Sequence, residues 1–144
     1  LCDGRSKMSK SDPNDASRIT LLDPPELITK KIKRAKTDPQ MGLQFGNPDR
    51  PEADNLLSIY SILSGRGREA AALECSDMGW GTFKPLLADA TVSALEPIQH
   101  RYKQLMDDRD ELTKILKQGR DRAEDTAQAT LKRVRQALGF LTGD

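Results

Sequence analysis

The stretch FKPLLADATVSALEPIQHRYKQL, residues 83–105, decides the fold class of this chain. Its apolar residues recur every three or four positions, which places them along one face of an α-helix. Pro85 suits the first turn of such a helix. Pro97 lies inside it and predicts a kink, because proline lacks the N–H that a helix interior uses. The residues that share this spacing are Phe83, Leu86, Leu87, Ala90, Ala94, Leu95, Ile98, Tyr102 and Leu105.

Three further helices are predicted upstream of this stretch. The first starts at DPPE, with Asp23 as N-cap and Pro24 in the first helical position, and runs to about Lys36. The second begins at Pro51 and stops at Gly65, and a short third spans about 68–75. The expected buried positions in the first two are Ile28, Ile32 and Ala35, then Leu56, Ile59, Tyr60 and Leu63.

Two more helices are predicted downstream, and the chain between 1 and 22 shows little periodicity. Leu112, Ile115 and Leu116 suggest a short helix that Gly119 ends. A last helix carries Ala123, Ala127, Leu131, Val134 and Leu138 and ends at Gly139. Because no segment alternates with period two, the predicted fold is all-α, a bundle of about five to seven helices.

Composition narrows the function classes. The 144 residues carry a formal net charge of only +1 although 31% are charged, which indicates solvated helix faces more than a general polyanion-binding surface. No apolar run approaches the roughly 20 residues of a membrane span. Cys2 and Cys75 lie far apart without metal spacing, which favours a reducing compartment over a disulfide.

Residues with catalytic potential are scarce. His100 has no base, nucleophile or carboxylate pair at a useful spacing, so we expect a surface residue. The acidic run from Asp107 to Glu111 could bind a cation but better suits a helix N-terminus, where negative charge is favourable. No cluster has the spacing of zinc ligands, and we predict no metal site.

One motif does carry chemistry: KMSKS, at residues 7–11, followed by the turn signal SDPND. Lys7 and Lys10 are flexible ammonium groups that can meet different oxygens of one polyphosphate. Ser9 and Ser11 add hydroxyl donors, loop N–H groups can form an anion nest, and Met8 would anchor the loop on an apolar surface. A solvated basic loop is the alternative. The order of the five residues, followed by DPN and a helix start, favours a phosphate clamp.

KMSKS is similar to the signature loop of class I aminoacyl-tRNA synthetases, and the residues after it narrow the choice. KMSKSDPNDASRITLLDPPELITKKIKRAKTD, NLLSIYSILSG, GWGTFKPLLADATVSAL and RYKQLMDD closely resemble the C-terminal part of bacterial tryptophan–tRNA ligases. The resemblance covers nearly the whole chain and ends with TLKRVRQALGF. The KKIKRAKTD segment favours the tryptophan enzyme over its tyrosine relative.

The resemblance implies a parent enzyme that activates tryptophan with ATP and Mg²⁺ and then transfers it to its tRNA. By motif, Lys7 and Lys10 would be catalytic, and residues 7–11 would hold the ATP phosphates. The family's Rossmann-type domain would precede residue 1, so we expect the chain alone to be inactive. The expected parts are residues 1–22 as the tail of the catalytic domain, 23–105 as a helical anticodon-binding domain, and 106–144 as C-terminal helices. A cytoplasmic, homodimeric parent without membrane contact is also implied.

Several readings stay open at this point. Lys30, Lys31, Lys33, Arg34 and Lys36 could contact tRNA phosphates or could merely complement a helix C-terminus. Lys132, Arg133 and Arg135 carry the same ambiguity, with helix solvation favoured, and Trp80 better suits packing between helices than base stacking. For the chain as a whole, a non-catalytic helical tRNA-binding module or a helical protein-interaction domain are the alternatives to a ligase fragment.

Overall fold

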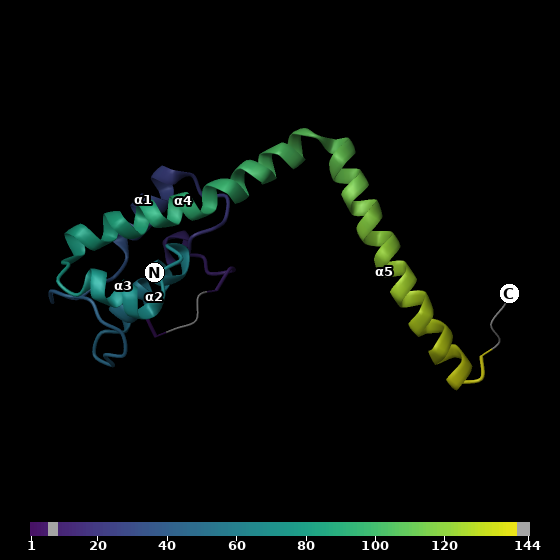
Figure 1. Ribbon diagram of the computed structural model, residues 1–144, viewed down its shortest axis with the longest axis horizontal. Helices are drawn as coiled ribbons and strands as arrows, with labels where there is room; N and C mark the ends of the chain where they lie inside the picture. Colours follow the sequence, from purple (N-terminus) through teal and green to yellow (C-terminus); the bar gives the residue numbers. More distant parts are fainter. Residues whose placement is uncertain (6–8, 141–144) are drawn as a thin grey trace. The chain divides into compact units, whose positions relative to one another are not determined.

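The computed structural model describes residues 1–5 and 9–140, and these residues form helices and loops without a strand. The helices are a 3₁₀ turn η1 (Asp15–Ser17) and α1 (Pro25–Arg34), α2 (Pro51–Leu63), α3 (Arg68–Cys75), α4 (Trp80–Asp107) and α5 (Arg109–Ala137) (Figure 1). The prediction of an all-α chain with five to seven helices is confirmed. Lys7 and Met8 lie outside the described residues.

The chain divides into two compact units, Leu1–His100 and Arg101–Asp144. The first unit contains η1, α1, α2, α3 and most of α4, and the second contains the end of α4 and α5. The functional boundaries at 22/23 and 105/106 stay predictions.

The helix α1 begins one residue later than the sequence predicts. Pro25 takes the first helical position and Pro24 precedes it, without a side-chain cap. The prediction that Asp23 is the N-cap is therefore wrong. Its carboxylate instead accepts hydrogen bonds from the Thr20 backbone N–H and hydroxyl. The helix ends at Arg34, two residues before the predicted Lys36.

The helices α2 and α3 follow the sequence prediction closely and pack side by side. Pro51 occupies the first turn of α2, where a missing N–H costs nothing. Gly65 ends the helix with φ of +69°, a left-handed conformation that glycine adopts without a Cβ penalty. The loop from 38 to 50 contains no helix, as its Pro, Gly and Asn residues indicate.

The hydrophobic core lies entirely within the first unit. Phe83 is fully buried at its centre, with Tyr60 edge-on at 5.8 Å and Trp80 edge-on at 6.0 Å between ring centroids. Such edge-to-face pairs stabilise beyond the area they bury. The buried apolar residues are Leu1, Ile28, Ile32, Ala35, Leu43, Ala53, Leu56, Leu57, Tyr60, Ala71, Cys75, Phe83, Leu87, Ala88 and Leu95.

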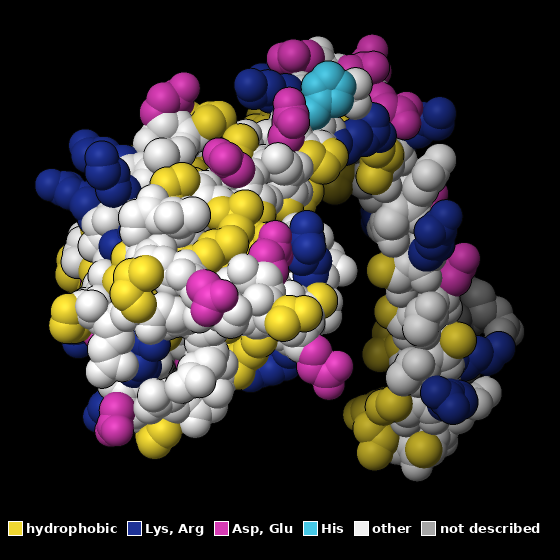
Figure 2. Space-filling model, turned by 60° about the vertical axis from the view of Figure 1, so that its left-hand side comes forward, with side chains coloured by type: hydrophobic (Ala, Val, Ile, Leu, Met, Phe, Trp, Pro, Cys, Tyr) yellow, Lys and Arg dark blue, Asp and Glu magenta, His cyan; other side chains and the backbone are white. Residues whose placement is uncertain are grey.

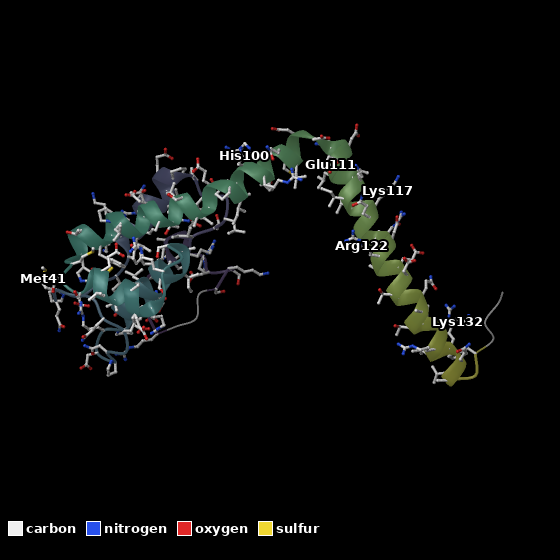
Figure 3. All side chains as sticks on the ribbon, viewed as in Figure 1. Met41, His100, Glu111, Lys117, Arg122 and Lys132 are labelled. Atoms are coloured by element: carbon white, nitrogen blue, oxygen red, sulfur yellow. The ribbon has the colours of Figure 1, made fainter. Side chains whose placement is uncertain are left out.

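The helix α4 contributes to this core only as far as Leu95. Its apolar stripe continues along the predicted face, but Ile98 and Tyr102 are 47% and 44% exposed. Pro97 lies inside the 28-residue helix, which continues past it to Asp107. His100 lies on the exposed part of α4 (Figure 3), as predicted.

The second unit contains one long helix where the sequence predicts two. Gly119 does not end a helix but lies inside α5, because the helix formers on both sides outweigh its cost of about 1 kcal/mol. Asp108 caps α5 by accepting a hydrogen bond from the Glu111 N–H at 2.9 Å, which confirms the capping role of the acidic run. Gly139, with φ of +72°, follows the helix at the predicted position.

The helix α5 is amphipathic in sequence, yet none of its residues, all of which the structure describes, is buried. Charged side chains such as Glu111, Lys117, Arg122 and Lys132 project along its length (Figure 3), and hydrophobic side chains are also visible on its surface (Figure 2).

Within the described part of the chain, no helix has the length and apolar character needed to cross a membrane. Cys2 is exposed and Cys75 is buried, and the two are not bonded.

Candidate functional site

The described part of the phosphate-clamp motif is an exposed turn. Ser9, Lys10 and Ser11 are all exposed, and the two serine hydroxyl oxygens lie 3.2 Å apart. The Asp12 N–H donates to the Ser9 carbonyl oxygen at 3.4 Å, which closes the turn that contains these three residues. Two hydroxyls and one ammonium group on a solvent-facing turn can reach an anion, but the roles predicted for Lys7 and Met8 lie outside the described residues.

The chain that follows this turn is tied to α1 by a network of charged groups. Arg18 donates to the Asp12 carbonyl oxygen at 2.6 Å and pairs with the Asp15 carboxylate at 3.5 Å. Lys31, only 3% exposed, places its Nζ 2.8 Å from Asp15 and 2.6 Å from Asp23. Sequence reasoning missed this network.

The electrostatics of the network keep its buried members charged. Burial alone would lower the pKa of Lys31, but hydrogen bonds to Asp15 and Asp23 outweigh this effect and raise it. Burial would likewise raise the pKa of Asp23, yet the hydrogen bonds from Lys31 and Thr20 bring it below its ordinary value. Lys31 is thus an ammonium held between two carboxylates and is unavailable to an external ligand.

The basic segment of α1 separates into two groups. Lys30, Lys33 and Arg34 are exposed and share one helix face through their spacing of three and four residues. Lys31 points into the fold, and Lys36 pairs with Glu52 at 2.8 Å. Three of the five cations therefore face solvent without an ion-pair partner among the described residues. Only these three stay candidates for contact with tRNA phosphates.

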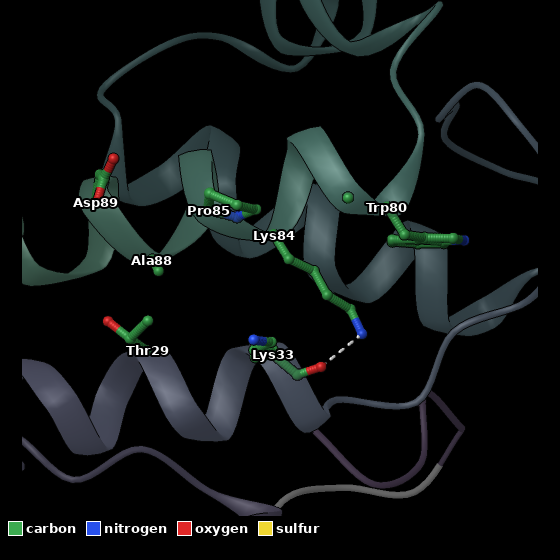
Figure 4. A pocket seen from close by; sticks show the side chains of 8 residues that line it. Thr29, Lys33, Trp80, Lys84, Pro85, Ala88 and Asp89 are labelled. Carbon is green, nitrogen blue, oxygen red and sulfur yellow. Dashed lines mark hydrogen bonds between the residues drawn. The ribbon is translucent and has the colours of Figure 1, made fainter.

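A cavity of about 530 Å³ lies between α1 and the start of α4, beside this exposed face (Figure 4). Lys33 and Lys84 bring positive charge to it, and Trp80 brings a half-buried aromatic ring. The Trp80 ring packs edge-on against Phe83 of the same helix and lies against the core, and its predicted role as an anchor between helices stays a prediction. The lining residues are Thr29, Lys33, Trp80, Gly81, Lys84, Pro85, Ala88 and Asp89.

Lys84 joins the two walls of this cavity. Its Nζ donates to the carbonyl oxygens of Lys33 at 3.0 Å and Ala35 at 2.8 Å, at the C-terminal end of α1. Burial lowers the pKa of Lys84. No local sequence pattern indicates this contact, because its acceptors lie about 50 positions away along the chain.

The described residues offer no metal centre. Among them, no three His, Cys, Asp or Glu side chains gather in a way that could hold a metal ion.

Comparisons with known proteins give a consistent result. Residues 1–96 match the family model described as tRNA synthetases class I (W and Y). The chain is 86% identical over 98% of its length to a tryptophan–tRNA ligase of Prochlorococcus marinus strain MIT 9313. It is 57% identical to that of Synechocystis and 55% identical to the chloroplastic/mitochondrial enzyme of Arabidopsis thaliana, over 98% and 97% of its length.

A solved structure supports the fold. The tryptophanyl-tRNA synthetase of Mycoplasma pneumoniae superposes with a TM-score of 0.81 and 28% identity, covering 99% of this chain and 45% of that one. The chain spans 42% of the length of the two cyanobacterial relatives and 34% of the plant relative.

Proposed function

Because the chain belongs to the class I tRNA synthetases of the tryptophan and tyrosine group, we propose that it is the C-terminal part of a tryptophan–tRNA ligase. The 86% identity over nearly the whole chain to a protein of that name carries the proposal. The parent would activate tryptophan with ATP and transfer the tryptophanyl group to its tRNA. We expect it to be cytoplasmic and homodimeric, on the resemblance alone.

The motif residues of this chain would act on the nucleotide. The tryptophan carboxylate attacks the α-phosphorus of ATP, and the bond to the departing pyrophosphate breaks. Lys7 and Lys10 would stabilise the negative charge on that leaving group, while Ser9 and Ser11 would hydrogen-bond its oxygens. The exposure of Lys10 and the adjacent serine hydroxyls support this role. Mg²⁺ is implied only through the nucleotide that carries it.

The helix α1 of the first unit would contact the tRNA. Lys30, Lys33 and Arg34 form an exposed positive face, and RNA binding depends largely on such charges. Lys33 of this face also lines the neighbouring cavity. This face favours tRNA binding over a protein-interaction role.

The decisive experiment is tryptophan-dependent ATP–pyrophosphate exchange by the full-length parent and its Lys10→Ala variant. Loss of one preorganised charge donor should slow exchange by roughly 10²–10³-fold. The KM for tryptophan should change little, since the lysine need not touch the amino acid. Residues 1–144 alone should give no exchange above background. Exchange by Lys10→Ala at the wild-type rate would refute the clamp role of that lysine.

A further inference from the structure

The network around Lys31 has one member that lies outside the core. Lys31 already has a buried partner in Asp23, whose side chain is 9% exposed. The second partner, Asp15, is 59% exposed and belongs to η1, outside the core. Both carboxylates accept from this ammonium, and a buried charge needs such partners. The carboxylate of Asp15 in addition connects the helix to the chain segment that follows the phosphate loop.

This segment is linked to the loop by an ion pair and by hydrogen bonds. Asp15 pairs with Arg18, and Arg18 in turn donates to the Asp12 carbonyl oxygen at 2.6 Å. The Asp12 N–H donates to the Ser9 carbonyl oxygen, and the Asp12 carboxylate accepts from the Asn14 N–H at 2.8 Å. Four consecutive contacts thus lead from the buried Lys31 ammonium through Asp15, Arg18 and Asp12 to the turn that carries Ser9, Lys10 and Ser11.

The turn itself is held by little else. Ser9, Lys10 and Ser11 are exposed, so packing does not fix their position. A group that stabilises a leaving phosphate must nevertheless be held within a fraction of an ångström of its working position, since misplacement by about 1 Å can cost about 10²-fold in rate. The Lys31 ammonium is buried and therefore fixed in position, so contacts that lead from it can restrain the exposed turn.

We infer that Asp15, held by Lys31, is a positioning residue for the phosphate-binding turn at Ser9–Ser11. The inference rests on the proposed function, because it concerns the geometry of the same loop. Asp15 does not touch the nucleotide; it acts by keeping Arg18 and Asp12 where they restrain the turn. The Lys10 ammonium is then already held near its working position when the pyrophosphate oxygens reach it.

A purely structural role for Asp15 makes a different prediction. If the pair only stabilised the fold, its loss would lower the melting temperature and reduce the amount of active protein by the same factor in any background. If it positions the turn, its loss should matter only while Lys10 is present to be positioned. A double-mutant cycle separates the two, because coupling appears only between residues that act through each other.

The test measures single-turnover adenylate formation by the full-length parent in four forms: wild type, Asp15→Asn, Lys10→Ala and the double variant. Asp15→Asn removes one exposed carboxylate charge and leaves the Lys31–Asp23 pair in place, so the protein should fold. Because the other hydrogen bonds of the segment remain, we expect a loss of about tenfold, less than for full misplacement. In the Lys10→Ala background the same change should have almost no effect.

Two controls complete the design. Asp77→Asn makes the same chemical change at an exposed site elsewhere in the first unit, and its rate should match the wild type. Asp15→Glu keeps the charge and should recover part of the lost rate. The tryptophan concentration that gives half of the maximal single-turnover rate should be unchanged in every Asp15 variant.

Each outcome is decisive. Equal loss in both backgrounds, or no loss from Asp15→Asn, would overturn the positioning role while leaving the proposed function intact. If Lys10→Ala itself has no effect, the proposed role of the loop fails, and this inference fails with it. A tenfold loss that disappears in the Lys10→Ala background would establish Asp15 as a positioning residue.

Discussion

The exposed positive face of α1 leads to a prediction about the salt dependence of tRNA binding. We consider the change of Lys30, Lys33 and Arg34 together to alanine. Alanine has the highest helix propensity, and none of the three side chains is buried, so α1 should stay folded. Lys84 binds the backbone carbonyl of Lys33, which the substitution leaves in place.

The expected magnitude follows from the number of charges. Each phosphate contact contributes about 0.7 to 0.9 to the slope of log K against log salt, so three contacts contribute about 2 to 3. Between about 50 and 200 mM salt, the wild type should therefore lose about 20- to 40-fold more affinity than the triple variant. The near-neutral total charge of +1 keeps the nonspecific background low.

The assay is a filter-binding titration of the tRNA for tryptophan at several salt concentrations, with a noncognate tRNA beside it. The matched control changes Lys132, Arg133 and Arg135 on α5 to alanine, which removes the same charge from another exposed surface. We expect the control to keep the wild-type slope. Equal slopes for the α1 variant and the wild type would refute the reasoning and assign these cations to helix stabilisation.

Two further predictions concern the buried groups. The pKa of Asp23 lies below its ordinary value of 3.8, so the stability from its charged form is present above pH 3.8 and is lost as the pH falls through the folded-state pKa. The difference in melting temperature between wild type and Asp23→Asn should therefore shrink below about pH 4, and a constant difference would contradict the ion pair. Burial raises the pKa of Cys75 to about 11, so iodoacetamide at pH 8 should label the exposed Cys2 in the native protein and leave Cys75 unmodified, as peptide mass mapping can check.

The helices of the first unit were predictable because their signals are local. Proline at the start and glycine at the end delimit α2, and the apolar spacing of α1 correctly places Ile28 and Ile32 in the core. The same spacing could have shown that Lys31, three residues after Ile28, shares the buried face. Its burial depends on Asp15 and Asp23, and no local pattern shows that distant carboxylates converge on one position.

Only those residues of the candidate site that belong to a recognised sequence motif could be predicted. The KMSKS residues were identified from sequence, and their roles stay predictions. The cavity beside Trp80 and the contact of Lys84 with the end of α1 arise from packing between segments about 50 residues apart. Gly119 shows that a local signal can also mislead. Glycine often ends a helix, but this one is tolerated inside α5, because it is a single unfavourable residue among many favourable ones.

The absence of buried residues in α5, all of whose residues the structure describes, has a thermodynamic consequence for the 144-residue chain. The heat capacity of unfolding and the denaturant m-value both grow with the surface that unfolding exposes. The 29 residues of α5 expose little new surface, so both quantities should fall below those typical of a globular chain of this length. Far-ultraviolet circular dichroism would combine a cooperative transition of the core with the gradual helix–coil melting of α5, and a single two-state fit would underestimate the stability of the core.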